Sequence, residues 1–352
     1  MKEKLTIINK EQFGSLTDSL KWCQYLRDRY DITFLCFDSG RSRLYLDGIK
    51  VIYISSRGPK FFRAIRFFFI CCINILKNRS KVLVVYFNNC HLFKLLFPKI
   101  KMQMDIRTLA VLGDKESRSE YNEGIKYSSK YFDIVSVISE RIRDVLGLNG
   151  NNTYILPLGA DIISDVPKDY SEIKLLYVGT LNGRRISDTI AGLYDFISNN
   201  KDVVVTYDIV GDGFELNNLK KLVKKLGLMN VVTFHGHIPY DELSPFYAKC
   251  NVGVSYVPMT DYYDNQPPTK VYEYALSGLF QIATSTSANR GLISNSNGVL
   301  IKDNSDDFSF ALSKVYAMRN TIDEIVIRSS LSHSTWTRIV HEDLISILEK
   351  LK

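Results

Sequence analysis

The sequence predicts an α/β protein of two domains, each built around a doubly wound parallel sheet. Short runs rich in Val, Ile and Phe alternate with segments of helical periodicity, first up to residue 148 and again from residue 174. This alternation is typical of β–α–β units, and the stretch GNNTYILPLGADI at 150–162 interrupts it. The 352 residues, 45% of them hydrophobic, suffice for two separate cores. We therefore expect domains over 1–160 and 161–330, and a C-terminal helix over 331–352.

The strands follow from runs of β-branched and aromatic residues, and the helices from the spacing of apolar residues. In the first domain we expect strands at 5–9, 32–37, 51–54, 82–87 and 133–138, and helices at 15–30 and 139–148. In the second domain we expect strands at 174–180, 203–211, 230–236, 252–258 and 280–285, and helices at 217–228 and 271–278. Ligands of open α/β sheets bind at the carboxyl ends of the strands. The residues just after each strand are therefore the first candidates for function.

Composition narrows the class of protein. The net charge of +7 suits a phosphate-bearing ligand or an anionic membrane surface, and is too diffuse to indicate nucleic acid by itself. None of the six cysteines forms a CxxC pair, which favours reduced core residues of a cytosolic protein. The start of the chain has no apolar run typical of a signal peptide. The most apolar stretch, 67–76, is shorter than the ~20 residues that span a bilayer.

Two glycine turns follow strands of the second domain. In YVGTLNGRR, Gly179 ends a strand, and two arginines precede a helical pattern. Glycine permits close approach of the backbone, and both a helix N-terminus and arginine favour phosphate. Taken alone, this motif is better explained by a plain turn with solvated arginines. The GDG of DIVGDGFE is a turn signal without the full GxGxxG pattern.

The stretch QPPTKVYEYALSG predicts a helix with charged residues in its first turn. Pro267 and Pro268 give an extended entry, and Thr269 is expected to be the N-cap. Glu273 is stabilised near a helix N-terminus by the helix dipole, whereas Lys270 is not. A lysine there is better explained by a bound anion. The glutamate could then accept hydrogen bonds from the hydroxyls of a ribose.

Two clusters resemble metal sites without completing one. His235 and His237 have no third His or Cys at ligand spacing, so we predict no zinc site. The segment DNSDD at 303–307 lacks a calcium-loop pattern, and we expect a solvated loop.

Taken in order, these segments resemble a retaining GT-B glycosyltransferase of the family-4 type (glycosyl transferases group 1), of the class that serves bacterial surface polysaccharides. The resemblance rests on YVGTLNGRR, on 209–258, on PPTKVYEYALSGLFQIATS and on NGVLI. The first half matches in outline through NKEQFGSLTDSL, MDIRTL, VISERI and LPLGADI, and SHSTWTRIV resembles a helix that returns to the first domain. The implied fold is two Rossmann-like domains facing across a cleft.

The resemblance also implies roles for single residues. Arg185 and Lys270 would bind the diphosphate, and Glu273 the ribose. Asn265 stands where the family has the first glutamate of its pair. Arg107 stands where many relatives have an active-site histidine, with Asp105 nearby. Gly14 would lie on the acceptor side. The other residues implied in donor binding are Gly179, Thr180, Arg184, Gly211, Gly213, His237, Ile238, Gln266 and Thr269.

The implied activity is retaining transfer of a sugar from a nucleotide-diphosphate sugar to a glycan or a polyprenyl-diphosphate-linked acceptor. No cofactor, metal or nucleic acid is expected. Two alternatives remain open: a GT-B nucleotide-sugar 2-epimerase, and an inactive nucleotide-sugar sensor, which Asn265 makes conceivable. A nucleic-acid binder rests on the net charge alone.

The segment 58–81 has basic ends, a dense aromatic and aliphatic centre, and no acidic residue. It fits either a buried helix of the first domain or a face that docks on anionic lipid, with Arg63 and Arg66 at the headgroups. The expected location is the cytoplasm, with weak contact to the inner face of the plasma membrane under the second interpretation.

Overall fold

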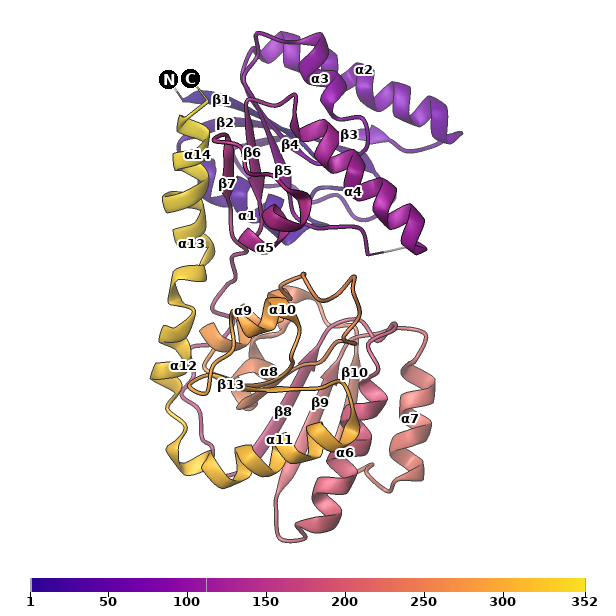
Figure 1. Ribbon diagram of the computed structural model, residues 1–352, viewed down its shortest axis with the longest axis vertical. Helices are drawn as coiled ribbons and strands as arrows, with labels where there is room; N and C mark the ends of the chain where they lie inside the picture. Colours follow the sequence, from indigo (N-terminus) through magenta and orange to yellow (C-terminus); the bar gives the residue numbers. More distant parts are fainter. Residues whose placement is uncertain (1, 112, 352) are drawn as a thin grey trace. The chain divides into compact units, whose positions relative to one another are not determined.

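The computed structural model describes residues 2–111 and 113–351, which fall into two compact units (Figure 1). Unit 1 comprises residues 1–159 and 336–352, and unit 2 comprises residues 160–335. The chain therefore passes from one unit to the other twice, after Gly159 and after Thr335.

Unit 1 contains a seven-stranded parallel sheet with the order β3-β2-β1-β4-β5-β6-β7. Its strands are β1 (Glu3–Ile8), β2 (Tyr30–Asp38), β3 (Ile49–Ser55), β4 (Lys81–Val85), β5 (Met102–Ile106), β6 (Ile134–Val137) and β7 (Thr153–Ile155). Its helices are α1 (Thr17–Leu26), α2 (Lys60–Asn78), α3 (His91–Leu96), α4 (Lys115–Ser129), α5 (Glu140–Leu146), α13 (Trp336–Arg338) and α14 (Ile345–Glu349), with a π-helical turn at Ile339–Leu344.

Aromatic contacts join the helices on one face of this sheet. Phe68 of α2 stacks on Phe93 of α3, with ring centroids 4.7 Å apart. His91 of α3 meets Tyr127 of α4 edge to face at 5.1 Å. The helices α2, α3 and α4 therefore form one layer, and α1 packs against the returning α13.

The returning segment is fixed by Trp336. A Cβ on Gly159 would lie 2.4 Å from the indole ring, so only glycine leaves room for the tryptophan there. Trp336 is 1% exposed, and its burial holds the end of the chain in unit 1.

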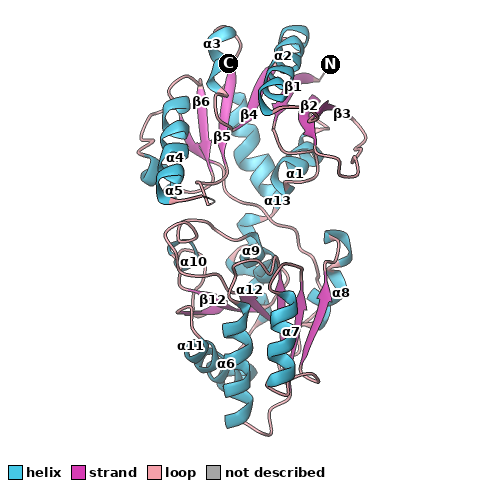
Figure 2. Cartoon of the chain, turned by 90° about the vertical axis from the view of Figure 1, so that its right-hand side faces the viewer, coloured by secondary structure: helices cyan, strands magenta, loops and turns pink. Residues whose placement is uncertain are grey.

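Unit 2 contains a six-stranded parallel sheet with the order β10-β9-β8-β11-β12-β13. Its strands are β8 (Ile173–Val178), β9 (Val205–Val210), β10 (Val232–Gly236), β11 (Val252–Ser255), β12 (Phe280–Thr284) and β13 (Gly298–Ile301). Its helices are α6 (Ile186–Asn199), α7 (Leu216–Lys225), α8 (Ser244–Lys249), α9 (Thr269–Leu276), α10 (Ser287–Arg290), α11 (Ser305–Met318) and α12 (Glu324–Ser330). Helices α6 and α7 pack side by side, α6 also packs on α11, and α9 packs on α12 (Figure 2).

Tyr274 of α9 anchors this helix to the sheet of unit 2. Its ring covers Gly253 of β11, where a Cβ would lie 2.4 Å from the ring, and its hydroxyl accepts a hydrogen bond from the amide of Val178 at 3.0 Å. Buried Leu176, Val210 and Tyr247 belong to the same core cluster. The helix that carries Lys270 and Glu273 is therefore fixed against the end of β8.

The two Rossmann-like parallel sheets confirm the predicted fold class, and each predicted strand is present within a few residues of its expected ends. Two local predictions are wrong. Thr269 is the first helical residue of α9, and the N-cap is Pro268, which has no side-chain donor or acceptor. Only residues 303–304 of the predicted loop 303–307 lie outside a helix. Residues 305–307 form the first turn of α11, where Asn304 caps the helix by accepting from the amide of Asp307 and the acidic residues favour the positive helix end.

All six cysteines are free, and each except the half-buried Cys72 is buried. Across residues 2–111 and 113–351, no helix combines the length and the apolar character that crossing a bilayer requires.

Candidate active site

The candidate site lies where the strand order of unit 2 reverses. Strand β8 has β9 on one side and β11 on the other, and the chain runs outward from β8 in both directions. In parallel sheets such a switch point leaves a crevice at the carboxyl ends of the strands. The segments that follow β8, β9 and β11 meet at this end of the sheet.

Three adjacent strands of unit 2 end in glycine, and their main chains are in direct contact. The amide of Gly179 donates to the carbonyl of Val210 at 3.0 Å, and the amide of Gly211 donates to that of Gly236 at 2.7 Å. A Cβ on Gly211 would lie 1.8 Å from the carbonyl oxygen of Gly179. A Cβ on Gly213 would lie 2.4 Å from Oδ1 of Asn182. The strand ends therefore present bare backbone.

Lys270 reaches these strand ends from the first turn of α9. Its Nζ lies 3.9 Å from the centroid of the Tyr177 ring, and a Cβ on Gly179 would lie 2.9 Å from the same atom. Burial and, to a smaller extent, the charge of Arg184 lower the pKa of the Lys270 ammonium to about 7, against the opposing effect of Glu273. The ammonium is therefore a poorly compensated cation beside the backbone of β8.

Glu273 lies one turn further along α9 and is 7% exposed. Its Oε2 accepts a hydrogen bond from the Tyr247 hydroxyl at 3.2 Å. Burial raises the pKa of this carboxyl to about 7, against the opposing effects of the Tyr247 and Tyr240 hydroxyls and of Lys270. The structure thus brings together the lysine and the glutamate that the sequence singled out.

Arg185 is held by two carboxylates. It is the N-cap residue of α6, with a left-handed φ of 53°. Its guanidinium pairs with Asp188 at 2.7 Å and with Asp303 at 2.9 Å. Its charge is therefore compensated within the protein, which is a poor arrangement for the main phosphate-binding arginine predicted at this position.

Arg184 is the arginine whose charge acts on Lys270. Its guanidinium carbon lies 4.4 Å from the centroid of the Tyr263 ring, and the arginine lowers the pKa of Lys270. Within residues 2–111 and 113–351, no carboxylate forms an ion pair with Arg184. The resemblance pointed to Arg185 as the diphosphate-binding arginine. The sequence does not show that Asp303 lies beside it.

The remaining residues predicted to bind the donor lie around the same end of the sheet. Thr180 follows Gly179, is exposed, and its carbonyl accepts from the Tyr177 hydroxyl at 2.7 Å. Asn265 and Gln266 lie between β11 and α9. His237 is exposed after β10, and Ile238 packs on the core cluster of unit 2.

His235 has a partner within the fold. Its Nε2 lies 2.7 Å from Oδ1 of buried Asp208, whose other oxygen accepts from Lys249 at 2.7 Å. The described part of the chain holds no group of three or more side chains suited to a metal ion.

Arg107 and Asp105 in unit 1 are buried and committed to internal contacts. Arg107 donates to Asp18 at 2.7 Å and to the carbonyl of Leu156 at 2.8 Å. Asp105 is 0% exposed, and one of its oxygens accepts from the Ser136 hydroxyl at 2.5 Å. Burial raises the pKa of Asp105 to about 6, although Arg107 and Ser136 lower it. These contacts tie both side chains into the interior of unit 1, and the catalytic role expected from their position stays a prediction.

Gly14 lies in the segment between β1 and α1, with a φ of 89°. A Cβ there would lie 3.2 Å from the side chain of Leu44. This glycine is exposed, as the predicted position on the acceptor side requires.

The second unit matches a known family. Residues 160–327 match the family model described as glycosyl transferases group 1, so the sequence-based resemblance is confirmed for this segment. No curated protein sequence matches the chain.

Solved structures share the fold over the whole chain. Sucrose-phosphate synthase from Thermosynechococcus elongatus is 15% identical with a TM-score of 0.78, and the match covers 99% of each chain. The Anabaena protein Alr3699/HepE in complex with UDP is 14% identical with a TM-score of 0.76, covering 99% of this chain and 100% of that one. WaaG, a glycosyltransferase involved in lipopolysaccharide biosynthesis, is 13% identical with a TM-score of 0.65 and 98% of each chain covered.

Arg107→Met tests the structural role of this arginine. The change leaves the carboxylates of Asp18 and Asp105 without their buried partner. Removing one member of a buried ion pair costs about 3–5 kcal/mol, so we expect a clear loss of stability in urea unfolding. The matched control is Arg43→Met, which breaks the exposed pair with Asp38 and should change unfolding little. Wild-type unfolding of Arg107→Met combined with lost turnover would restore the catalytic assignment.

Proposed function

We propose that this chain, whose residues 160–327 form a glycosyl transferases group 1 domain, transfers a sugar from a nucleotide-diphosphate sugar to an acceptor with retention of the anomeric configuration. The observation that carries the proposal is the pairing of Lys270 and Glu273 on the first turns of α9, beside the bare backbone that ends β8 and β9. A cation and a buried carboxylate at a helix N-terminus match the two ends of a nucleoside diphosphate.

The diphosphate would lie between the N-terminus of α9 and the turn after β8. The first N–H groups of a helix have no partner within the helix, and they favour phosphate oxygens. Lys270 and Arg184 would add charge at the same place. The close main-chain packing of Gly179 and Gly211 leaves space that side chains would otherwise fill.

Glu273 would accept the ribose hydroxyls of the donor. Its carboxyl lies within the first two turns of α9 and is held by the Tyr247 hydroxyl. A structure of the similar Alr3699/HepE is described as a complex with UDP-glucose. Uridine nucleotide sugars are therefore the first donors to test.

The chemistry needs negative charge to be stabilised on the leaving diphosphate. Lys270 and Arg184 supply fixed positive charge there, and such preorganised charge lowers the barrier to bond cleavage. We therefore propose that the reaction requires no metal ion and no other cofactor, and that no side chain of the protein acts as a nucleophile.

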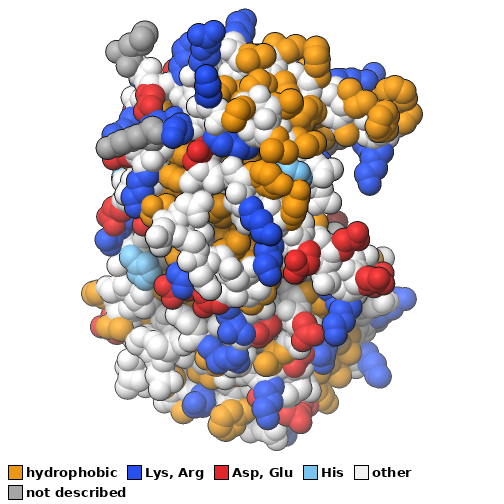
Figure 3. All heavy atoms as spheres, turned by 45° about the horizontal axis from the view of Figure 1, so that its top comes forward, with side chains coloured by type: hydrophobic (Ala, Val, Ile, Leu, Met, Phe, Trp, Pro, Cys, Tyr) orange, Lys and Arg blue, Asp and Glu red, His pale blue; other side chains and the backbone are white. Residues whose placement is uncertain are grey.

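The proposed acceptor is a glycan, free or carried on a polyprenyl diphosphate, in assembly of a bacterial surface polysaccharide. An exposed apolar face on unit 1 supports a lipid-linked acceptor. Of the large residues of α2, only Phe67, Cys71 and Ile75 are buried. Six others are exposed, namely Phe61, Phe62, Ile65, Phe69, Ile73 and Leu76. Hydrophobic side chains gather over this part of unit 1 (Figure 3).

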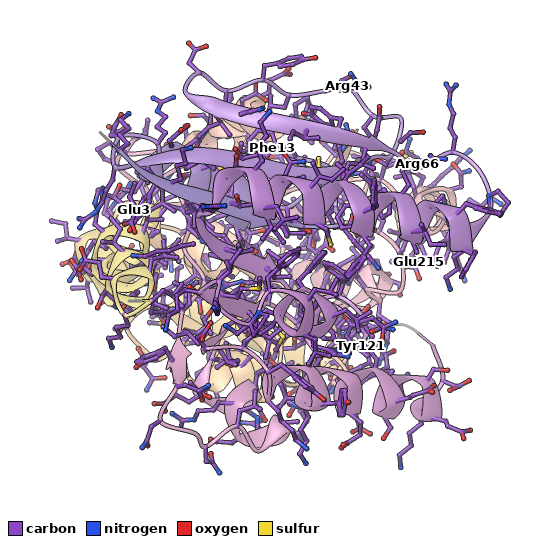
Figure 4. All side chains as sticks on the ribbon, turned by 90° about the horizontal axis from the view of Figure 1, so that it is seen from above. Glu3, Phe13, Arg43, Arg66, Tyr121 and Glu215 are labelled. Atoms are coloured by element: carbon purple, nitrogen blue, oxygen red, sulfur yellow. The ribbon has the colours of Figure 1, made fainter. Side chains whose placement is uncertain are left out.

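The arrangement of α2 disagrees with a fully buried helix and fits a helix lying on a membrane surface. Its apolar face is open, and basic residues stand at both ends, with Lys60 at the first and Lys77 at the last turn. Arg66 lies on the side of α2 toward β3, where it donates to the carbonyls of Ser55 and Arg57 (Figure 4). We propose that the protein works at the cytoplasmic face of the membrane, in weak contact with anionic lipid.

The function is tested by incubating the protein with nucleotide sugars and measuring the release of nucleoside diphosphate. A transferase releases it slowly alone and faster with a glycan acceptor, with or without EDTA. Arg184→Ala should reduce turnover more than Arg185→Ala, because only Arg185 is neutralised by Asp188 and Asp303.

Three results would overturn parts of this assignment. Release accompanied by a new nucleotide sugar or a free glycal indicates the 2-epimerase, and no release from any bound donor indicates the sensor. Activity that EDTA abolishes and a divalent metal restores contradicts the metal-free mechanism.

Donor affinity should depend on pH in a bell-shaped way with its maximum near pH 7. Lys270 loses its proton above its pKa of about 7, whereas Glu273 gains one below its pKa of about 7. A bound diphosphate raises the pKa of the ammonium, so affinity should fall by up to about tenfold per pH unit above pH 7. Calorimetric titrations between pH 5.5 and 8.5 measure this. Lys270→Met should remove the alkaline limb and Glu273→Gln the acidic limb. A profile unchanged in both variants would place the donor elsewhere.

Flotation with anionic vesicles at low salt tests the membrane contact. The wild type should float with anionic vesicles and less so as salt rises, because salt screens the basic residues. Phe61→Ser with Phe69→Ser should weaken flotation by roughly tenfold or more, since two aromatic side chains no longer leave water. Phe310→Ser is the matched control, because Phe310 is 65% exposed and Phe69 is 64% exposed. Equal flotation of all three proteins would remove the membrane contact and leave the transferase assignment in place.

A further inference from the structure

Unit 1 contains an apolar groove that the donor site does not use. The α2 groove, as we call it, has a volume of about 800 Å³ and lies between α2, the segment after β4, and α4. Its walls are mainly apolar, formed by Phe61, Ala64, Ile65, Phe68, Phe87 and Leu92. Tyr121 closes it from the side of α4 that faces α2 (Figure 4). A hollow of this size fits one small ligand or one hydrocarbon chain.

Two lysines interrupt the apolar wall of the groove. Lys10 follows β1, and its Nζ lies 4.4 Å from the centroid of the Phe87 ring. Lys60 is the first residue of α2 and also lines the groove. Burial lowers the pKa of Lys10, and the nearby charge of Lys60 lowers it further. Both lysines therefore line the same groove, and the charge of Lys60 acts on Lys10.

Neither lysine is compensated by an acid. Over residues 2–111 and 113–351, neither lysine forms an ion pair with a carboxylate. Two like charges that line one groove repel each other, and a bound anion would offset this repulsion. A phosphate group carries charge of the required sign.

A second, polar pocket continues from the same end of the α2 groove. It has a volume of about 370 Å³, and Asn88, Asn89 and Tyr121 line both hollows. Its own lining includes Tyr86 and Glu120. Aromatic rings beside amide and carboxylate groups suit a polar ligand with many hydroxyls. The depression thus changes from apolar to polar, and the two lysines stand on its apolar side.

The α2 groove also opens toward the exposed face of α2. Phe61, Ile65 and Phe69 line the groove, and the same side chains are 70%, 49% and 64% exposed. A chain leaving a bilayer that contacts α2 would therefore meet an apolar path into the groove without crossing water.

We infer that the α2 groove binds the hydrocarbon chain of a lipid phosphate, with Lys10 and Lys60 on its phosphate and the attached sugars in the adjoining polar pocket. This rests on the proposed function, because the lipid phosphate would be the carrier of the acceptor glycan. The site differs from the position near Gly14 at which the acceptor was expected. The apolar wall would hold the chain, the lysines the anion, and the adjoining polar pocket the sugars.

The test uses the full chain and geranylgeranyl monophosphate below its critical micelle concentration, with binding measured by titration calorimetry. Geranylgeraniol carries the chain alone, and inorganic phosphate carries the anion alone. We expect the monophosphate to bind at least about tenfold more tightly than the alcohol, because charged hydrogen bonds add about 1.5–3 kcal/mol. Inorganic phosphate at the same concentration should not compete, since it lacks the chain.

Two variants locate the binding. Lys10→Gln with Lys60→Gln should reduce the affinity for the monophosphate at least about tenfold and leave that for the alcohol unchanged. Ala64→Trp should abolish binding of both, because the indole fills the groove. The controls are Lys99→Gln with Lys101→Gln, and Leu76→Trp, an exposed position on α2 outside the groove. Circular dichroism confirms that each variant is folded.

The outcomes separate this inference from the proposed function. Equal affinity for monophosphate and alcohol, displacement by inorganic phosphate, or unchanged binding in both groove variants would overturn it. If nucleotide sugar binds and is turned over with a soluble glycan while no lipid phosphate binds, only the present inference fails. If no nucleotide sugar binds at all, the proposed function fails, whatever the groove binds.

Discussion

The candidate donor site depends on direct contact between the main chains at the ends of β8 and β9. A Cβ on Gly211 would lie 1.8 Å from the carbonyl oxygen of Gly179, so no side chain fits between these strand ends. The Nζ of Lys270 in turn occupies space next to Gly179, where a Cβ would be 2.9 Å away. Because Gly179 and Gly211 have no side chains, the Lys270 ammonium can reach the switch point at the end of β8. The Tyr274 ring on Gly253 fixes α9 and completes this geometry.

Some charged side chains of the candidate donor site are paired within the protein, and others remain available to a ligand. Asp188 and Asp303 neutralise Arg185, which ties the start of α6 to the segment before α11. Arg184 stacks on Tyr263 and acts on Lys270. Burial opposes the charged forms of both Lys270 and Glu273, which brings each pKa to about 7. A bound anion would favour the charged form of Lys270, and hydroxyl donors would favour the charged form of Glu273. The site therefore suits a ligand that carries both groups.

The sequence predicted the sheets well and the site in part. Runs of Val, Ile and Phe mark the strands because a parallel sheet buries both faces, and four ordered motifs placed Lys270 and Glu273 correctly on one helix. Two results depend on tertiary contacts that spacing does not reveal, and a third is local. Asp303 lies 118 positions from Arg185 in the sequence and pairs with it. The charge of Arg185, and not that of Arg184, is therefore compensated by this carboxylate. Arg107 donates hydrogen bonds to Asp18 and to the carbonyl of Leu156, so its guanidinium is held inside unit 1. Thr269 is not the N-cap of α9, because Pro268 is the last extended residue and takes that position.

Under the proposed function, unit 2 binds the donor and unit 1 binds the acceptor. The donor side in unit 2 is built from main chain at strand ends and from a helix fixed in the core, so a change there disturbs the sheet. The α2 groove in unit 1 is built from side chains on the outer layer of helices, and Phe61, Ile65 and Phe69 are largely exposed. Exposed positions tolerate substitution far better than buried ones. Under the proposed function, substitutions on α2 or at Lys10 would change acceptor preference and leave the candidate diphosphate site in unit 2 unchanged.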